Sequence, residues 1–197
     1  FIGLTSGLGF YFNSYFWDWK PSDVAIFAII DLTAALVISA MAGPLSARFD
    51  KKRMAIGLFI IAIGVGPILL ILRLADLWWG LNILPENGEK FGALWWVMMF
   101  HSLIAASVGV LAWILVASMT ADVVEDSQRK TGKRSEGLFF AGPHLIQKAI
   151  SGVGLMIKGM ILTLIGFSAT ASEAEKIASM QDLAVVIVVL SLTLPMV

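Results

Sequence analysis

Cysteine is absent from the 197 residues of this chain, and histidine and tyrosine occur only twice each. The lack of cysteine excludes disulfides, thiolate metal sites and a cysteine nucleophile. The two histidines, His101 and His144, lie far apart outside any His-Glu-x-x-His motif, and no Gly-x-x-x-x-Gly-Lys phosphate-binding loop occurs. We therefore expect neither an enzyme nor a nucleotide-driven motor, and no bound metal or cofactor.

Charge is also scarce. Only 14% of the residues are charged, against about 25% in typical soluble domains, and 58% are hydrophobic, with a mean hydropathy of +0.87. The 14 basic residues balance the 14 acidic ones, so the chain has no net basic field that would attract nucleic acid. This composition predicts an integral membrane protein whose main surroundings are the lipid bilayer.

Six apolar segments are separated by polar connectors. Each segment is continuous rather than alternating, which indicates helices and not barrel strands. The predicted spans are 1–17, 22–47, 54–74, 91–120, 137–167 and 183–197. The chain begins and ends inside apolar stretches, so we expect both end spans to be truncated. The predicted fold is one all-α bundle of about six transmembrane helices over residues 1–197.

Basic residues concentrate on one side of the predicted bundle. Connectors alternate sides, so 48–53 and 121–136 share a side, and together they carry eight basic residues. The connectors on the other side carry Lys20, Arg73, Lys90 and Lys176. The positive-inside rule therefore predicts that 48–53 and 121–136 are cytoplasmic. Tryptophans that favour the opposite interface flank the connector 73–90; they are Trp78, Trp79, Trp95 and Trp96.

Ionisable side chains inside the spans are the first candidates for a functional site, because a charge there costs about 2.5 to 3.5 kcal/mol on insertion scales. They are Asp31, His101, His144, Lys148 and Lys158. Those of the fifth span share one helical face with Gln147 and Ser151, at spacings of three, four and seven. Such a face suits a water-accessible cavity that binds a polar solute. The alternative is pairing with neighbouring helices, with Lys158 reaching the outer interface.

Asp31 and His101 lie in other spans. Asp31 is either a buried charge partner or a direct ligand of an ion or solute. Its depth is comparable to that of Lys158, although adjacency of the two does not follow from depth. For His101, with Ser102 beside it, the favoured role is a hydrogen bond between helices.

The first span combines Tyr11 and Asn13 with an unusual density of aromatic residues. Aromatic faces with amide groups suit binding of a sugar, and the same composition is equally typical of an interfacial aromatic belt. Tyr11 and Asn13 are therefore candidates for the solute site, with the belt as the alternative.

The fourth connector and its flanks carry a spaced set of motifs: Ala121-Asp122, then Gly132-Lys133-Arg134-Ser135-Glu136-Gly137, then Lys148. This set resembles the glycoside-pentoside-hexuronide:cation symporters, a family of the major facilitator superfamily typified by melibiose permease. The basic stretch 48–53 is similar to the loop after the second helix of a major facilitator half. The resemblance covers nearly the full length and implies the C-terminal half of such a transporter, with the N-terminal half as its partner.

The resemblance also implies a function and residue roles. We expect a secondary transporter of the bacterial inner membrane, moving a sugar or glycoside with Na⁺ or H⁺ by alternating access. A carrier of lysolipids or other amphiphiles is the alternative. Lys148 matches the family lysine near the solute and cation sites. Asp122, Arg134 and Glu136 match charges that help close the cytoplasmic gate, with ordinary surface ion pairs as the alternative.

Overall fold

A computed structural model of the protein describes residues 8–9, 11–86, 90–133, 135–165 and 172–193, and these residues are helical or lie in short connectors. A short π-helical turn precedes five α-helices. The elements are η1 (Phe12–Phe16), α2 (Pro21–Arg48), α3 (Lys51–Trp79), α4 (Ala93–Thr131), α5 (Glu136–Leu164) and α6 (Glu173–Thr193). In the described part of the chain four helices, α2 to α5, are long and apolar enough to cross a membrane. The predicted all-α membrane bundle is confirmed.

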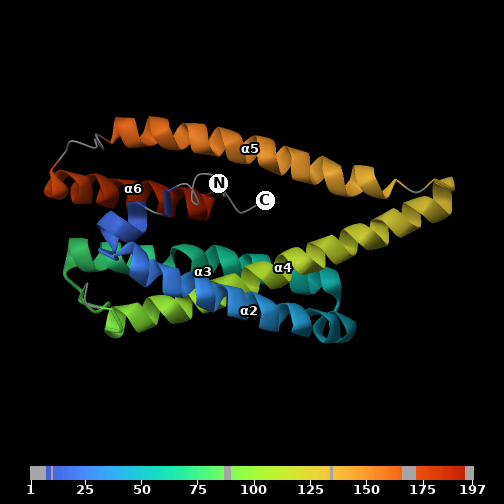
Figure 1. Ribbon diagram of the computed structural model, residues 1–197, viewed down its shortest axis with the longest axis horizontal. Helices are drawn as coiled ribbons and strands as arrows, with labels where there is room; N and C mark the ends of the chain where they lie inside the picture. Colours follow the sequence, from blue (N-terminus) through green and yellow to red (C-terminus); the bar gives the residue numbers. More distant parts are fainter. Residues whose placement is uncertain (1–7, 10, 87–89, 134, 166–171, 194–197) are drawn as a thin grey trace.

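Helices α2, α3 and α4 form a packed group, and α6 and α5 lie beside it. Helices α2 and α3 each pack along α4, and α6 packs against α3 and η1. Helix α5 continues the chain from the far end of α4 and runs back along the other side of the molecule (Figure 1). The α2–α3 and α4–α5 connectors, which carry the basic residues, lie toward the same end of the molecule in this view (Figure 1).

Local sequence explains where the helices begin and end. Pro21 occupies the first position of α2, where its missing N–H costs no hydrogen bond. The carboxylate of Asp50 caps α3 by accepting a hydrogen bond from the backbone N–H of Arg53 at 2.8 Å. Gly80 and Gly132 follow α3 and α4 in the left-handed conformation, with φ of 62° and 69°, which favours glycine.

Helix α4 differs most from its predicted bounds. The apolar segment was expected to end at residue 120, yet α4 continues to Thr131, so residues 121–131 are helix and the connector is only 132–135. Two ion pairs at i,i+4 spacing support this polar extension, Glu125 with Arg129 and Asp126 with Lys130, each at 2.7 Å.

Other bounds also differ from the sequence prediction, most of all those of α3 and α6. Helix α3 extends to Trp79 rather than 74, and it begins at Lys51, so most of the stretch 48–53 is helical. Helix α6 begins at Glu173 rather than 183. Residues 1–7, 10 and 194–197 of the two predicted end spans lie outside the described residues.

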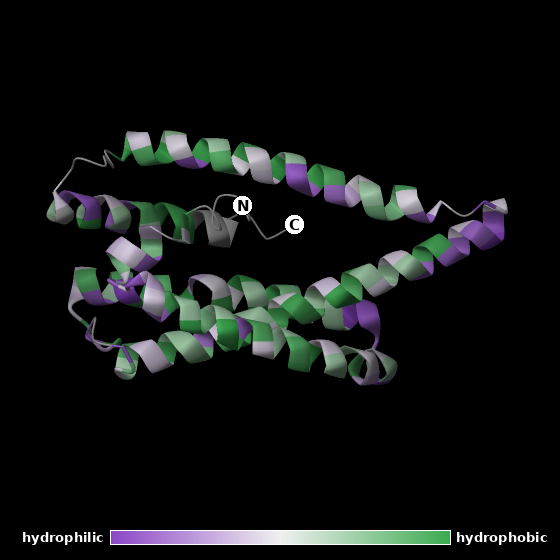
Figure 2. Ribbon diagram, viewed as in Figure 1, coloured by the Kyte–Doolittle hydropathy of each residue, from purple (hydrophilic) through white to green (hydrophobic). Residues whose placement is uncertain are grey.

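The buried core lies where η1 and α6 meet the α2–α3–α4 group. Its centre is aromatic: the ring of Phe27 in α2 stacks on Trp95 in α4, with centroids 5.2 Å apart. A smaller cluster of Ala42, Ala55, Leu111 and Leu115 joins α2, α3 and α4 near their other ends. Most other apolar side chains point outward, and hydrophilic residues concentrate at the helix ends and in a band across the middle of α5 (Figure 2). Such an apolar exterior suits lipid.

Candidate functional site

The polar face of α5 is the main candidate site. The structure places His144, Gln147, Lys148 and Ser151 on this helix, all at least partly exposed. Leu162, the one α5 residue described as buried, lies 18 residues after His144. Because 18 residues complete about five helical turns, Leu162 and His144 share a face. The polar face is therefore directed to the same side as Leu162, toward the rest of the protein.

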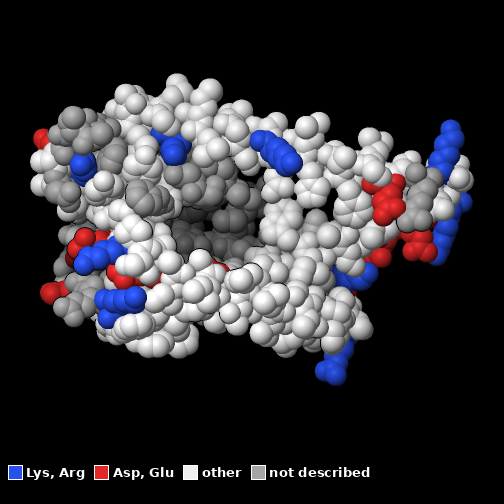
Figure 3. Space-filling view, in the orientation of Figure 1, with Lys and Arg blue, Asp and Glu red and all other residues white. Residues whose placement is uncertain are grey.

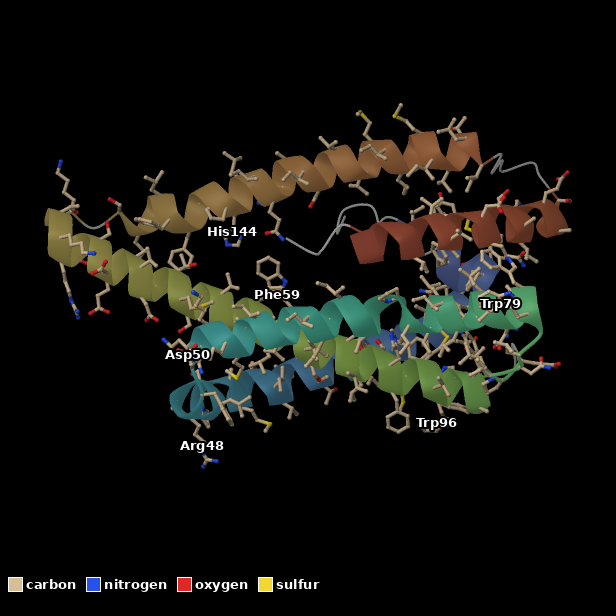
Figure 4. The ribbon with its side chains drawn as sticks, turned by 180° about the vertical axis from the view of Figure 1, so that it is seen from behind. Arg48, Asp50, Phe59, Trp79, Trp96 and His144 are labelled. Carbon is tan, nitrogen blue, oxygen red and sulfur yellow. The ribbon has the colours of Figure 1, made fainter. Side chains whose placement is uncertain are left out.

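The molecule is hollowed between α5 and the α2–α3–α4 group (Figure 3). His144 extends from α5 toward α3, and Phe59 extends from α3 toward α5 (Figure 4). The ring of Phe59 is held by an edge contact with Trp113 of α4, with centroids 6.4 Å apart. The hollow thus has a polar wall on α5 and an aromatic one on α3.

The polar groups on this wall have no partner within the described part of the chain. Within the described chain, the side chains of His144, Gln147, Lys148 and Ser151 make no hydrogen bond or ion pair. Charged atoms otherwise gather toward the two ends of the molecule, and the lysine atoms on α5 stand between them (Figure 3). An ammonium at this depth without a partner must meet water or a polar solute. Pairing with neighbouring helices, the alternative that the sequence left open, is not observed for these four side chains.

Lys158, one turn before Leu162, has a different environment. Its ammonium lies 5.4 Å from the centroid of the Tyr11 ring, a cation–π contact between α5 and the segment before η1. Lys176 of α6 lies 5.7 Å from the centroid of the Tyr15 ring. Asn13 is half-buried in η1, and its side-chain amide has no hydrogen-bond partner among the residues described. Tyr11 and Lys158, separated widely in sequence, are therefore brought together.

Asp31 lies on another interface. The hydroxyl of Ser102 in α4 donates a hydrogen bond to Oδ1 of Asp31 in α2 at 2.6 Å. No ion pair joins Asp31 to Lys158 or to any other described cation. The sequence indicated Asp31 and Ser102 separately. It did not indicate the contact between these two residues, because they are 71 positions apart.

His101 makes the predicted hydrogen bond between helices. Its Nε2 lies 2.7 Å from the carbonyl oxygen of Val65 in α3. A carbonyl oxygen only accepts, so Nε2 carries the proton and donates it. Ser102 and His101, adjacent in α4, thus connect this helix to α2 and α3 respectively.

Of the three residues predicted for a gate, the structure gives an ion pair for Asp122. Asp122 forms an ion pair with Lys51 at 2.8 Å, which connects α4 to the start of α3. Glu136 is the first residue of α5, and Arg134 lies outside the described residues. The sequence did not predict that Lys51 is the partner of Asp122. The one indication in the sequence was that both residues lie in connectors expected on the same side of the membrane.

Comparison with known proteins agrees with this architecture. The whole chain, residues 1–197, matches the family model described as MFS/sugar transport protein. An uncharacterized symporter of Synechocystis sp. is 40% identical over 73 residues, which are 36% of this chain and 13% of the relative. The match therefore spans much less than two thirds of that protein. No solved structure matches. Because the family model matches residues 1–197 and the described residues form a helical membrane bundle, this chain belongs to the MFS/sugar transport protein family.

Proposed function

We propose that this chain forms one wall of the solute pathway in a secondary active transporter that couples movement of a sugar or glycoside to a cation. The observation that carries the proposal is the unpartnered polar face of α5, centred on Lys148, across a hollow from α3. Polar groups inside a membrane protein normally pair with one another or face a water-filled cavity. A membrane helix that leaves several of them unpaired on its inward face supports a solute as the missing partner.

The chemistry of the wall suits a polyhydroxylated solute. Lys148 offers three N–H donors, and Gln147, Ser151 and His144 each offer a donor and an acceptor. A sugar hydroxyl both donates and accepts, so it satisfies such a mixed set. The ring of Tyr11, held near α5 by Lys158, adds the aromatic face on which a sugar ring packs.

Transport requires the hollow to open to each side in turn. We propose that this bundle is the C-terminal half and that it moves against an N-terminal half around a site near the middle of the membrane. The aligned segment of the Synechocystis relative, a protein described as a symporter, supports cation coupling. Na⁺ and H⁺ are the candidate ions.

The test is uptake by the full-length protein in proteoliposomes, with labelled sugars and glycosides under imposed H⁺ or Na⁺ gradients. Accumulation of a sugar that one gradient drives and an ionophore abolishes supports the proposal. Uptake of a labelled lysolipid, with no sugar accumulated under either gradient, rejects it in favour of an amphiphile carrier.

A further inference from the structure

Asp31 sits deep in an apolar helix. It is the eleventh residue of α2, which begins at Pro21, so its backbone lies about 15 Å along the axis from the helix start. Leu32 and Leu36, on the same stretch, are exposed to the surroundings that we assign to lipid. Asp31 itself is half-buried toward α4. A carboxylate in this position is costly unless something neutralises it.

No cation of the described chain neutralises Asp31. Its one side-chain contact is the hydrogen bond from Ser102 at 2.6 Å to Oδ1, and Oδ2 has no partner there. Helix α4 carries one titratable residue before its charged end at Asp122, namely His101, whose Nε2–H is committed to Val65 of α3. On α2 itself, Asp23 lies two turns away and is paired with Lys90 at 3.7 Å. Arg73 lies eight residues beyond Val65, about 12 Å along α3.

We propose that Asp31 and Ser102 form a proton-binding site between α2 and α4. One proton passes from water to Oδ2 of Asp31, the carboxylate becomes a neutral carboxyl, and no other bond changes. Ser102 continues to donate to Oδ1 in both states. Because the hydrogen bond from Ser102 to Asp31 persists when the carboxylate becomes neutral, a proton can bind and leave without separating α2 from α4.

The ligands favour a proton over a metal cation. Hard metal ions take several oxygen ligands, and within the described residues no group of three or more Asp, Glu or His side chains comes together. A proton needs a single base. This inference deepens the proposed cation coupling, because it names H⁺ as an ion that this half of the transporter can carry.

Infrared difference spectroscopy tests the site without any solute. The full-length protein is titrated between neutral and acidic pH, and the carbonyl stretch of a protonated carboxyl is followed. Among the bands of the protonated carboxyls, we expect one that belongs to Asp31. This band should disappear in Asp31→Asn, shift in Ser102→Ala through loss of the hydrogen bond, and return at a new frequency in Asp31→Glu. The control is Thr33→Val, which alters an exposed hydroxyl that bonds only to Ile29 of the same helix. A spectrum unchanged by Asp31→Asn overturns the proposal.

A second measurement connects the site to transport. Alkalinisation of a weakly buffered medium is recorded as the solute enters proteoliposomes of the wild type, Thr33→Val and Asp31→Asn. We expect proton movement with the first two and its loss in the third. Proton uptake in Asp31→Asn at the wild-type ratio to solute overturns the coupling role. If the wild type moves no sugar, the proposed function fails while the infrared bands still decide the proton site.

Discussion

The ammonium of Lys51, the first residue of α3, lies 2.8 Å from the carboxylate of Asp122 in the polar extension of α4. Lys51, Lys52 and Arg53 place three positive charges at the N-terminal end of α3, where the helix dipole is also positive. Asp122 offsets this repulsion from a neighbouring helix. The partner of Asp122 therefore lies within this bundle, and any gate contact with another half must compete with Lys51.

The first prediction concerns this pair. Both side chains are partly exposed, with relative accessibilities of 34% and 59%, so the pair should contribute no more than about 1 kcal/mol to stability. A double-mutant cycle of Lys51→Ala and Asp122→Ala, measured by denaturant unfolding in detergent, gives this coupling. The exchanged pair Lys51→Asp with Asp122→Lys should recover most of it, whereas Lys130→Ala, which breaks only a local pair, serves as the control. A coupling well above about 1 kcal/mol would contradict this expectation for a partly exposed pair.

The second prediction concerns Lys148. Lys148→Ala should lower cation-coupled uptake roughly tenfold or more, because a solute contact that no other described side chain replaces is removed, while insertion into the membrane is unaffected. Ile146→Ala is the matched control: Ile146 lies two residues away on the opposite face of α5 and is 61% exposed. Wild-type uptake by the Lys148→Ala transporter would contradict the role of this residue.

The third prediction concerns the hydrogen bond from His101 to Val65. His101→Ala should destabilise the bundle by about 0.6 kcal/mol and by no more than about 1.7 kcal/mol, the average and the maximum for hydrogen bonds between membrane helices. His101→Gln keeps a donor of similar reach and should lose less. Thermal unfolding in detergent measures both, and equal losses in the two variants would mean that the contact depends on the ring and not on the donated proton.

The fourth prediction concerns the start of α6, where Ser172 and Glu175 form a capping box. The backbone N–H and hydroxyl of Ser172 both donate to Glu175 at 2.9 Å, and the N–H of Glu175 lies 3.3 Å from the Ser172 hydroxyl. The hydrogen bonds from Ser172 lower the pKa of the Glu175 carboxyl below its ordinary value of 4.5. A lowered pKa in the folded state stabilises this helix end above pH 4.5, and the stabilisation is lost as the pH falls through the lower folded value.

Hydrogen exchange of the amides of Ser172 and Glu175, followed as the pH is lowered, measures this loss after correction for intrinsic rates. Glu175→Gln should remove the pH dependence, and Ser172→Ala should leave the helix start poorly protected at every pH. An unchanged pH dependence in Glu175→Gln would assign the titration to another group.

The sequence predicted the all-α membrane bundle because hydropathy reports directly on burial in lipid, and four of the predicted spans correspond to helices long and apolar enough to cross a membrane within the described residues. It predicted their ends less well, because lipid contact and helix formation are different properties. Residues 121–131 are polar, yet ion pairs such as Glu125 with Arg129 keep them helical until Gly132 ends the helix. Helix α6 likewise begins ten residues before its apolar part, because polar residues outside the lipid can also be helical.

The candidate site was predictable residue by residue but not as an arrangement. Helical spacing alone placed His144, Gln147 and Lys148 on one face, since that depends only on neighbours along the chain. The contacts of Asp31 with Ser102 and of Lys158 with Tyr11 join different helices. One sequence records no distance between helices, so these partners required the structure.

Helix α4 has 39 residues, which correspond to about 58 Å, nearly twice the thickness of a hydrocarbon core of about 30 Å. Its polar end therefore acts as a rigid lever attached to the membrane-embedded part. A tilt of about 10° around the helix middle displaces the tip by about 5 Å. Because α5 begins just beyond that tip, a small tilt of α4 around its middle would displace the start of the helix that carries Lys148.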